Sequence, residues 1–127
     1  MEVKDNLYYT KEHEWLKIEG NKGTVGITQY AANSLGDITF VEIVPPGADI
    51  VQFGRLGTIE SVKAASDVFS PISGKVTSIN SRVIDTPEIV NSSPYDDGWL
   101  ATVEILKLEE TKNLMTAEQY RQYIEKL

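Results

Sequence analysis

Lys63 lies in a segment whose small side chains leave its ammonium group open to other molecules. The segment reads ESVKAASD over residues 60–67, and only alanine and serine stand between the lysine and Asp67. A lysine carries its amine on a flexible four-carbon stem, and the amine becomes a nucleophile once it loses its proton. Lys63 is therefore a candidate anchor for a covalently attached prosthetic arm. From composition alone, a solvated lysine at a turn explains the same segment.

His13 and Glu14 form a second candidate pair, an imidazole beside a carboxylate near the start of the chain. Such a pair is suited to general acid–base chemistry. No nucleophile signature accompanies it, so the simpler interpretation is the start of a strand whose Trp15 fills part of the core.

Several residue types are missing, and their absence excludes several classes of site. The chain has no cysteine and a single histidine. Cysteine nucleophiles, thiolate-bound zinc, iron–sulfur clusters and disulfides are excluded, and a multi-histidine metal site is not expected. The 12 basic and 19 acidic residues give a net charge of −7. An acidic chain without a basic patch is a poor partner for nucleic acids and for anionic membranes.

The chain also lacks the signals of a membrane or exported protein. No apolar run approaches the roughly 18 residues that a membrane span requires. The first ten residues mix acidic and basic side chains and hold no apolar stretch, unlike a signal peptide. We therefore expect a cytoplasmic protein.

The elements that must position Lys63 and the His13–Glu14 pair are mostly short β-strands separated by turn residues. Valine, isoleucine, threonine and aromatic residues cluster in short runs bounded by Gly, Pro and Asn, as is typical of strands and hairpins. Strands are predicted at residues 15–18, 24–27, 38–44, 50–51, 56–60, 68–69, 75–79 and 99–107. At 127 residues the chain is expected to form one domain, a β-sandwich or partly closed barrel with helices at its margins.

Two helices are predicted from capping signals. Thr28 is a candidate N-cap for a helix that ends before Gly36. The TAEQ run at residues 116–119 is a capping-box pattern, and the apolar spacing after it predicts an amphipathic helix to residue 127. Residues 80–98 are polar and predict a long ordered loop, with a helical turn near Glu88.

Residues 60–67 closely resemble the lipoylation motif of the glycine cleavage system H protein family. The resemblance runs in order along almost the whole chain. Biotin carriers usually place methionine on both sides of their lysine, whereas Val62 and Ala64 flank Lys63. Lipoyl domains of 2-oxo acid dehydrogenases typically have aspartate where Val62 stands. Further matching segments are HEW (13–15), VGIT (25–28), LGD (35–37), SPISG (70–74), VNSSPY (90–95) and GW (98–99).

The resemblance implies a mainly β barrel-sandwich hybrid, the β-sandwich of lipoyl and biotinyl carriers, with short flanking helices. The single lipoyl-carrier domain would span residues 1–127, with a lipoyl-type core at about 22–104 and a C-terminal helix at about 116–127. Lys63 would carry lipoic acid in amide linkage. The chain would be a monomeric, non-catalytic carrier, and its redox sulfurs would belong to the cofactor, which fits the absence of cysteine.

The resemblance also implies a set of partner enzymes. A glycine decarboxylase, the pyridoxal-phosphate P protein, would load the aminomethyl group of glycine onto the oxidised lipoyl group. An aminomethyltransferase, the T protein, would release ammonia and pass the one-carbon unit to tetrahydrofolate, and a dihydrolipoyl dehydrogenase, the L protein, would reoxidise the dithiol. A lipoate ligase or a lipoyl/octanoyl transferase would modify Lys63.

Two residues near Lys63 are implied in its lipoylation. Glu60, three positions before the lysine, offers a carboxylate that a ligase can read. Gly74, eleven positions after it, is expected to adopt a positive φ that shapes the turn opposite the lysine hairpin. A solvated carboxylate and an ordinary turn glycine are the simpler interpretations.

Three carboxylates are implied at a cleft that receives the loaded arm. The aminomethyl group ends in a protonated amine, which Glu12, Glu14 or Asp67 can hold. The chain departs from the family at Tyr30 and Ser34, because many members carry histidine at or near these positions. Arm docking is therefore expected to differ in detail.

Other functions remain open from the sequence. An H-like lipoate donor or relay for other lipoyl domains would share the same fold and the same Lys63. An enzyme that uses Lys63 as a Schiff-base nucleophile would need a buried lysine with a lowered pKa, which small and acidic neighbours disfavour. A β-sandwich interaction module without a cofactor is the third alternative.

Overall fold

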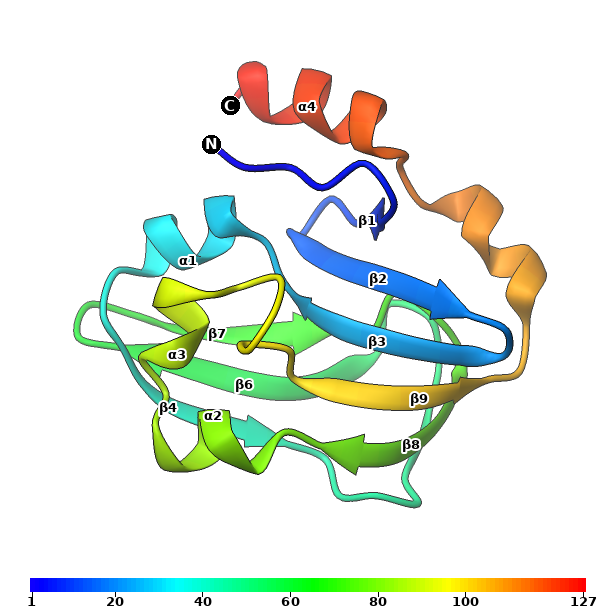
Figure 1. The fold of residues 1–127 in the computed structure, drawn as a ribbon, viewed down its shortest axis with the longest axis horizontal. Helices are drawn as coiled ribbons and strands as arrows, with labels where there is room; N and C mark the ends of the chain where they lie inside the picture. The colour runs from blue at the N-terminus through cyan, green and yellow to red at the C-terminus, as the bar shows by residue number, and fades with distance from the viewer.

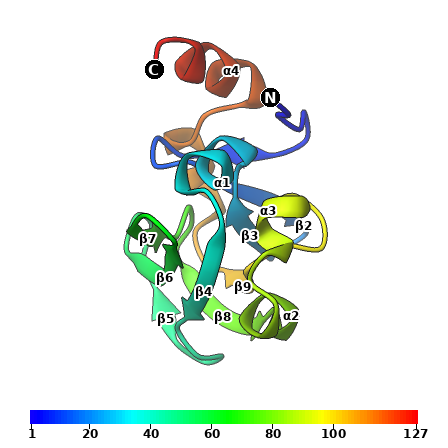
Figure 2. The same cartoon turned by 90° about the vertical axis from the view of Figure 1, so that its left-hand side faces the viewer.

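The computed structural model describes residues 1–127 and contains two antiparallel sheets. The larger sheet has the strand order β1-β2-β3-β9-β8-β5, and the smaller has the order β4-β6-β7. The predicted mainly β sandwich is therefore confirmed. Figure 1 shows the two sheets, and Figure 2 shows their layering from the side. The strands are β1 (Tyr8–Tyr9), β2 (Glu14–Glu19), β3 (Lys22–Ile27), β4 (Ile38–Ile43), β5 (Asp49–Ile50), β6 (Arg55–Ser61), β7 (Ala65–Phe69), β8 (Gly74–Ile79) and β9 (Ala101–Ile105).

Both helices predicted from capping signals are confirmed. Helix α1 (Gln29–Leu35) begins after Thr28, whose side chain accepts a hydrogen bond from the backbone N–H of Ala31. Gly36 ends α1 with a φ of 76°, a left-handed conformation that favours glycine. Helix α4 (Ala117–Glu125) begins with the predicted capping box between Thr116 and Gln119.

The segment predicted as a long loop holds more helix than expected. Helix α2 (Ser81–Asp85) was not predicted, whereas α3 (Ile89–Ser92) corresponds to the expected turn near Glu88. A third helical segment, the 3₁₀ helix η1 (Leu108–Asn113), was also not predicted. Each is six residues or shorter, so none repeats an apolar face often enough to produce a helical period in the sequence. The predicted strand at 99–107 is shorter in the structure, because β9 covers only Ala101–Ile105.

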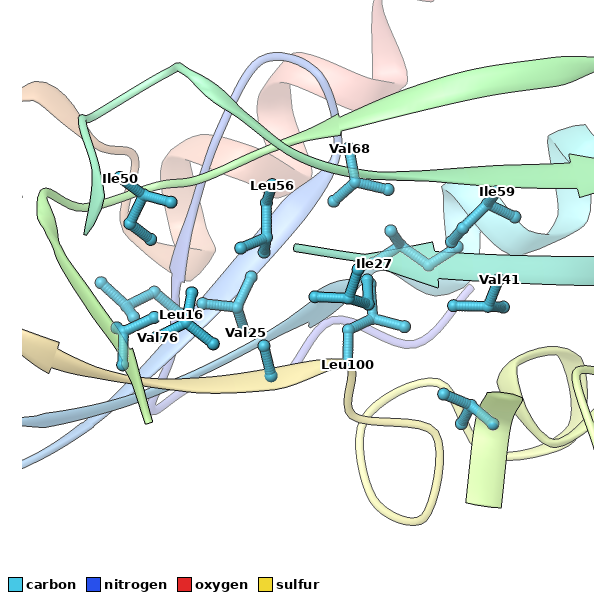
Figure 3. Close-up of a cluster of buried hydrophobic side chains, with 14 of the residues drawn as sticks. Leu16, Val25, Ile27, Val41, Ile50, Leu56, Ile59, Val68, Val76 and Leu100 are labelled. Atoms are coloured by element: carbon cyan, nitrogen blue, oxygen red, sulfur yellow. The ribbon is translucent and has the colours of Figure 1, made fainter. Parts of the chain in front are cut away.

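The main core lies between the two sheets. A cluster of 20 buried apolar residues takes side chains from both sheets and from α1, α2 and α3. Figure 3 shows Leu16 and Val25 of the larger sheet facing Leu56 and Val68 of the smaller one. Because successive strand residues point to opposite faces, the inner residues of β6 are buried while Glu60 is exposed.

A second cluster joins both ends of the chain to the larger sheet. Tyr9 and Tyr120 stack with ring centroids 4.4 Å apart and an interplanar angle of 6°. Trp15 and Tyr95 complete the aromatic part of this cluster, and Ala117 of α4 packs with them. Helix α4 is thereby packed over β1 and β2, at the top of the view in Figure 1. No helix in the structure is long and apolar enough to cross a membrane.

Candidate functional site

Lys63 lies at the exposed tip of the hairpin that joins β6 to β7. The backbone N–H of Ser61 donates to the carbonyl of Ala64 at 2.7 Å, which closes the turn. The Ser61 hydroxyl oxygen accepts from the backbone N–H groups of Lys63 and Ala64 at 3.3 and 3.1 Å. The neighbouring Val62 is 72% exposed. A Schiff-base lysine is activated in a desolvating pocket, and the hairpin tip offers Lys63 no such pocket.

The hairpin tip is anchored to the loop between α1 and β4. The backbone N–H of Val62 donates to the carbonyl of Asp37 at 3.1 Å. Asn91 of α3 holds the same loop, because its Nδ2 donates to the carbonyl of Gly36 at 2.8 Å and its Oδ1 accepts from the N–H of Ile38 at 2.9 Å. Asn91, in the VNSSPY segment at residues 90–95, thus supports the lysine hairpin indirectly, through the loop between α1 and β4.

Gly36 lies beside the lysine stem. A Cβ atom built on Gly36 would lie 3.5 Å from Cε of Lys63. That distance is ordinary van der Waals contact with the flexible end of the lysine, so a side chain at Gly36 is disfavoured by its φ of 76°. Figure 1 shows the β6–β7 hairpin and α1 at the same end of the sheets.

A cleft of about 280 Å³ lies between β2, the end of α1 and the outer strand β7. Its polar wall brings together the three predicted carboxylates of Glu12, Glu14 and Asp67, and its apolar part contains aliphatic side chains from β3, β6 and β7. Tyr30 and Ser34, the two positions that depart from the family pattern, also line it. No group of three His, Cys, Asp or Glu side chains in the chain is arranged to hold a metal ion.

Glu14 is the most deeply buried of the three carboxylates, with 2% of its surface exposed. Its Oε1 accepts a hydrogen bond from the hydroxyl of Thr10, and its Oε2 accepts from the backbone N–H of Phe69 at 3.1 Å. Burial raises the pKa of Glu14 to about 7, against the opposing effect of these two hydrogen bonds. Glu14 is therefore poised to gain or lose a proton near neutral pH.

Glu12 and Asp67 are more accessible than Glu14. Glu12 is exposed at the cleft edge, and the Asp67 side chain is 48% exposed. Asp67 already has partners, because Arg55 Nε lies 3.5 Å from its Oδ1 and the Thr58 hydroxyl donates to the same oxygen at 3.1 Å. Its capacity to hold a further cation is therefore shared with Arg55.

His13 lines the same cleft and adopts an unusual backbone conformation, with a φ of 74°. Its ring centroid lies 4.5 Å from that of Tyr30, and its Nδ1 lies 2.9 Å from the hydroxyl of Tyr120. Burial lowers the pKa of His13, which favours the neutral imidazole. The simpler interpretation of this segment is confirmed for Trp15, which is buried at the start of β2.

Glu60 and Gly74 lie outside the cleft. Glu60 is exposed on β6, opposite Phe40 of β4 and Ala65 of β7. The positive φ expected at Gly74 is wrong, because Gly74 is absent from the positive-φ residues and begins β8. Its small size is needed for another reason, since a Cβ atom there would overlap the carbonyl oxygen of Glu104 on β9. A part for Glu60 and Gly74 in lipoylation stays a prediction.

Four further residues of the site were not predicted: Thr10, Phe69, Asn91 and Tyr120. Asn91 lies in a segment that the family resemblance singled out, and the spacing after the capping box places Tyr120 on the apolar face of α4. Thr10 and Phe69 carry no signal in the sequence, because their role is a contact with a residue of another segment.

The structure thus places an exposed lysine at a hairpin tip, on a sandwich of two antiparallel sheets and beside a cleft. Comparison with known proteins identifies the family. The family model for the glycine cleavage H-protein matches residues 7–127. The chain belongs to the glycine cleavage H-protein family, and the resemblance stated from the sequence motifs is confirmed.

Relatives in sequence and in structure agree with this assignment. A glycine cleavage system H protein of Thermoanaerobacter sp. (strain X514) is 47% identical over 125 residues, which cover 98% of each chain. A putative mitochondrial glycine cleavage system H protein of Schizosaccharomyces pombe is 48% identical over 116 residues, which cover 91% of this chain and 69% of the relative. The crystal structure of a glycine cleavage system H protein from Mycobacterium marinum superposes with a TM-score of 0.86 at 30% identity, covering 97% of this chain and 99% of that one.

Proposed function

We propose that this chain is the lipoyl carrier of glycine cleavage and that Lys63 carries lipoic acid in amide linkage. Lys63 would hold the lipoyl group, which would supply the disulfide that accepts the aminomethyl group of glycine. The observation that carries the proposal is the exposed Lys63 hairpin beside a cleft with carboxylates on one wall.

The cleft walls fit such an arm and its cargo. Ala31 and Leu35 of α1 line the cleft and are half-buried, so they offer an apolar surface to a hydrocarbon chain, which is stabilised when water is removed from both surfaces. The cargo ends in an ammonium group, for which Glu12, Glu14 and Asp67 are suitable partners. The arm cleft, as we name the cavity at Glu12, Glu14, Tyr30, Ser34 and Asp67, would keep water from the cargo.

Glu14 is expected to contribute most to holding the ammonium group. A hydrogen bond to a charged group contributes about 1.5–3 kcal/mol when it is sheltered, and Glu14 is the buried carboxylate of the arm cleft. Exposed ion pairs contribute about 1 kcal/mol or less, so Glu12 and Asp67 would add smaller amounts. Arg55 would compete with the cargo for Asp67.

The same carboxylates favour a shuttle over the alternative of a lipoate relay. A carrier that only passes lipoyl groups to other domains handles an uncharged arm and needs no anionic cleft. An aminomethyl carrier must shelter a cation between one enzyme and the next. The proposed partners are glycine decarboxylase, the aminomethyltransferase, dihydrolipoyl dehydrogenase and a lipoate ligase or lipoyl/octanoyl transferase. The chain's net charge of −7 is suited to steering it toward basic active-site entrances.

Loading with labelled glycine tests this function. The lipoylated chain would be incubated with glycine decarboxylase and glycine labelled in its methylene carbon, and the unlipoylated chain would be the control. We expect the label on the lipoylated chain alone, as one aminomethyl group per molecule by intact mass. A lipoylated chain that takes up no label from an active decarboxylase would contradict the proposal.

A further inference from the structure

We infer that Tyr120, in the C-terminal helix α4, is a positioning residue that fixes the His13 side chain at the wall of the arm cleft. The inference rests on the proposed function, because it concerns the arm cleft. Tyr120 is fully buried and does not line the cleft itself. It would act through His13 and Thr28, and so it is no catalytic residue.

The hydroxyl of Tyr120 contacts the side chains of His13 and Thr28, whose backbones are already joined because the N–H of Thr28 donates to the carbonyl of His13 at 2.9 Å. Its oxygen lies 2.9 Å from Nδ1 of His13 and 2.7 Å from Oγ1 of Thr28. His13 lines the cleft and directly precedes Glu14, the buried carboxylate. Thr28 is the N-cap of α1, which supplies the cleft wall that contains Tyr30. The hydroxyl therefore adds a side-chain contact to the existing backbone link and fixes the orientation of the His13 ring, which packs on Tyr30.

The hydrogen bonds of the Tyr120 hydroxyl have a consistent direction. Oγ1 of Thr28 accepts from the backbone N–H of Ala31 at 3.2 Å and lies 2.7 Å from the Tyr120 oxygen, and in the arrangement we infer the Thr28 hydroxyl donates to Tyr120. The Tyr120 hydroxyl proton is then directed at Nδ1 of His13. Neutral histidine accepts at one ring nitrogen and carries its proton on the other, so His13 is expected to be protonated at Nε2. Burial favours this neutral form, since it lowers the pKa of His13.

The position of Tyr120 is itself set by the aromatic cluster. Its ring stacks on that of Tyr9, and the Tyr9 hydroxyl donates to the carbonyl of Lys4 at 2.7 Å. Both tyrosines are fully buried in the same cluster, but only Tyr120 reaches the arm cleft residues. Tyr9→Phe is therefore a matched control for Tyr120→Phe, because each change removes one buried hydroxyl from the same cluster.

The first measurement uses the unmodified chain and does not depend on the arm. His13 is the only histidine, so the imidazole nitrogen signals in a ¹⁵N NMR spectrum belong to it alone. We expect the parent and Tyr9→Phe to show the Nε2-protonated form with a hydrogen-bonded Nδ1. Tyr120→Phe should lose the hydrogen-bond shift at Nδ1. An unchanged His13 signal in Tyr120→Phe would overturn the inference.

The second measurement follows the cargo on the lipoylated, aminomethylated chain. Loss of the cargo consumes water, breaks the C–S bond and leaves a thiol, formaldehyde and ammonium. Without the Tyr120 hydroxyl, the His13 ring loses the partner that fixes its orientation at the cleft wall, while the backbone bond from Thr28 to His13 remains. Loss of the cargo in Tyr120→Phe should be about two- to tenfold faster than in Tyr9→Phe, the range for one buried hydrogen bond. The rate of lipoylation at Lys63 should be the same in both variants.

The outcomes separate the two proposals. Protection of the cargo in the parent, with equal decay in Tyr120→Phe and Tyr9→Phe, would overturn the role of Tyr120 and leave the arm cleft in place. Decay in the parent as fast as that of an aminomethyl adduct of free dihydrolipoamide would overturn the arm cleft, and the inference about Tyr120 with it. Faster decay only in Tyr120→Phe, together with the changed His13 signal, would support both.

Discussion

The Oε2 oxygen of Glu14 accepts a hydrogen bond from the backbone N–H of Phe69 at 3.1 Å. This contact joins β2 of the larger sheet to the end of β7, the strand that follows the Lys63 hairpin. The buried carboxylate therefore has two roles, since it connects the two sheets and also faces the arm cleft. Changes at Glu14 should alter both the stability of the fold and the fate of the cargo.

The stability of the unmodified chain should depend on pH through Glu14. Its pKa is raised from an ordinary value of 4.5 to about 7, so the folded state binds this proton more tightly than the unfolded chain. The resulting stabilisation is full below pH 4.5 and is lost as pH rises through 7. The free energy of unfolding should fall across this window by up to about 3 kcal/mol more in the parent than in Glu14→Gln.

His13 makes the comparison with Glu14→Gln necessary. The pKa of His13 is lowered, so its contribution to stability is lost as pH falls, which opposes the effect of Glu14. Urea titrations of both proteins at several pH values between 4.5 and 8 would isolate the Glu14 contribution as a difference. If the free energy of unfolding changed with pH in the same way in both proteins, Glu14 would have no raised pKa.

Glu14→Gln should also shorten the lifetime of the cargo without slowing lipoylation at Lys63. The ammonium group pairs with an ionised Glu14 but not with a neutral glutamine, and the expected acceleration is about tenfold at pH 8. The ratio of the two decay rates should increase with pH, with a midpoint at or below about 7, because the cargo's positive charge favours the ionised carboxylate.

Salt and the neighbouring carboxylates provide controls for this effect. High salt should accelerate cargo loss in the parent more weakly than Glu14→Gln does, since a buried pair is screened less than an exposed one. Glu12→Gln and Asp67→Asn should have smaller effects. Equal half-lives for the parent and all three variants would mean that carboxylates do not protect the cargo.

Glu60→Ala is expected to slow lipoylation while the fold stays unchanged. Glu60 is exposed and its side chain makes no hydrogen bond or ion pair in the structure. Surface substitutions of this kind usually change stability by about 0.5 kcal/mol or less. Initial rates with lipoate, ATP and ligase would be compared with those of Glu42→Ala, another exposed glutamate on the smaller sheet. Equal rates would refute a recognition role for Glu60.

Gly74→Ala should both destabilise the fold and slow lipoylation. A Cβ atom at this position overlaps the carbonyl oxygen of Glu104, so β8 and β9 must move apart, at a typical cost of about 1–3 kcal/mol. Gly20→Ala is the control, because it carries backbone strain at a φ of 64° but meets nothing within 4 Å. Lipoylation would be measured at a temperature where both variants are fully folded. A parental rate in folded Gly74→Ala would limit Gly74 to a structural role.

The sequence was sufficient for those parts of the fold whose signals are local. The N-cap at Thr28, the helix end at Gly36 and the capping box at Thr116 each depend on a few neighbouring residues, and the structure contains all three. Helix α2 was not predicted, because its cap at Asn80 introduces only one turn of helix in a polar segment. The positive φ expected at Gly74 was wrong, because a glycine needed for a turn and a glycine needed where two strands approach closely look the same in the sequence.

The contacts that build the site could not be predicted from the residues alone. Asn91 supports the loop at Gly36 from 55 positions away. Tyr120 meets His13 across 107 positions, and the environment that shifts the pKa of Glu14 exists only once β2 and β7 have come together. Such contacts are set by the packing of the sheets, and no regular spacing of residues in the sequence indicates them.

Intact mass spectrometry of the lipoylation reaction tests the central claim, that Lys63 is the site of the lipoyl group. The parent and Lys63→Arg would each be incubated with lipoate, ATP and lipoate ligase. Arginine retains the positive charge of lysine but offers no primary amine for acylation. We predict that the parent gains the mass of one lipoyl group and that Lys63→Arg gains none. A lipoyl group on Lys63→Arg, for instance at Lys75 on β8, would contradict the assignment.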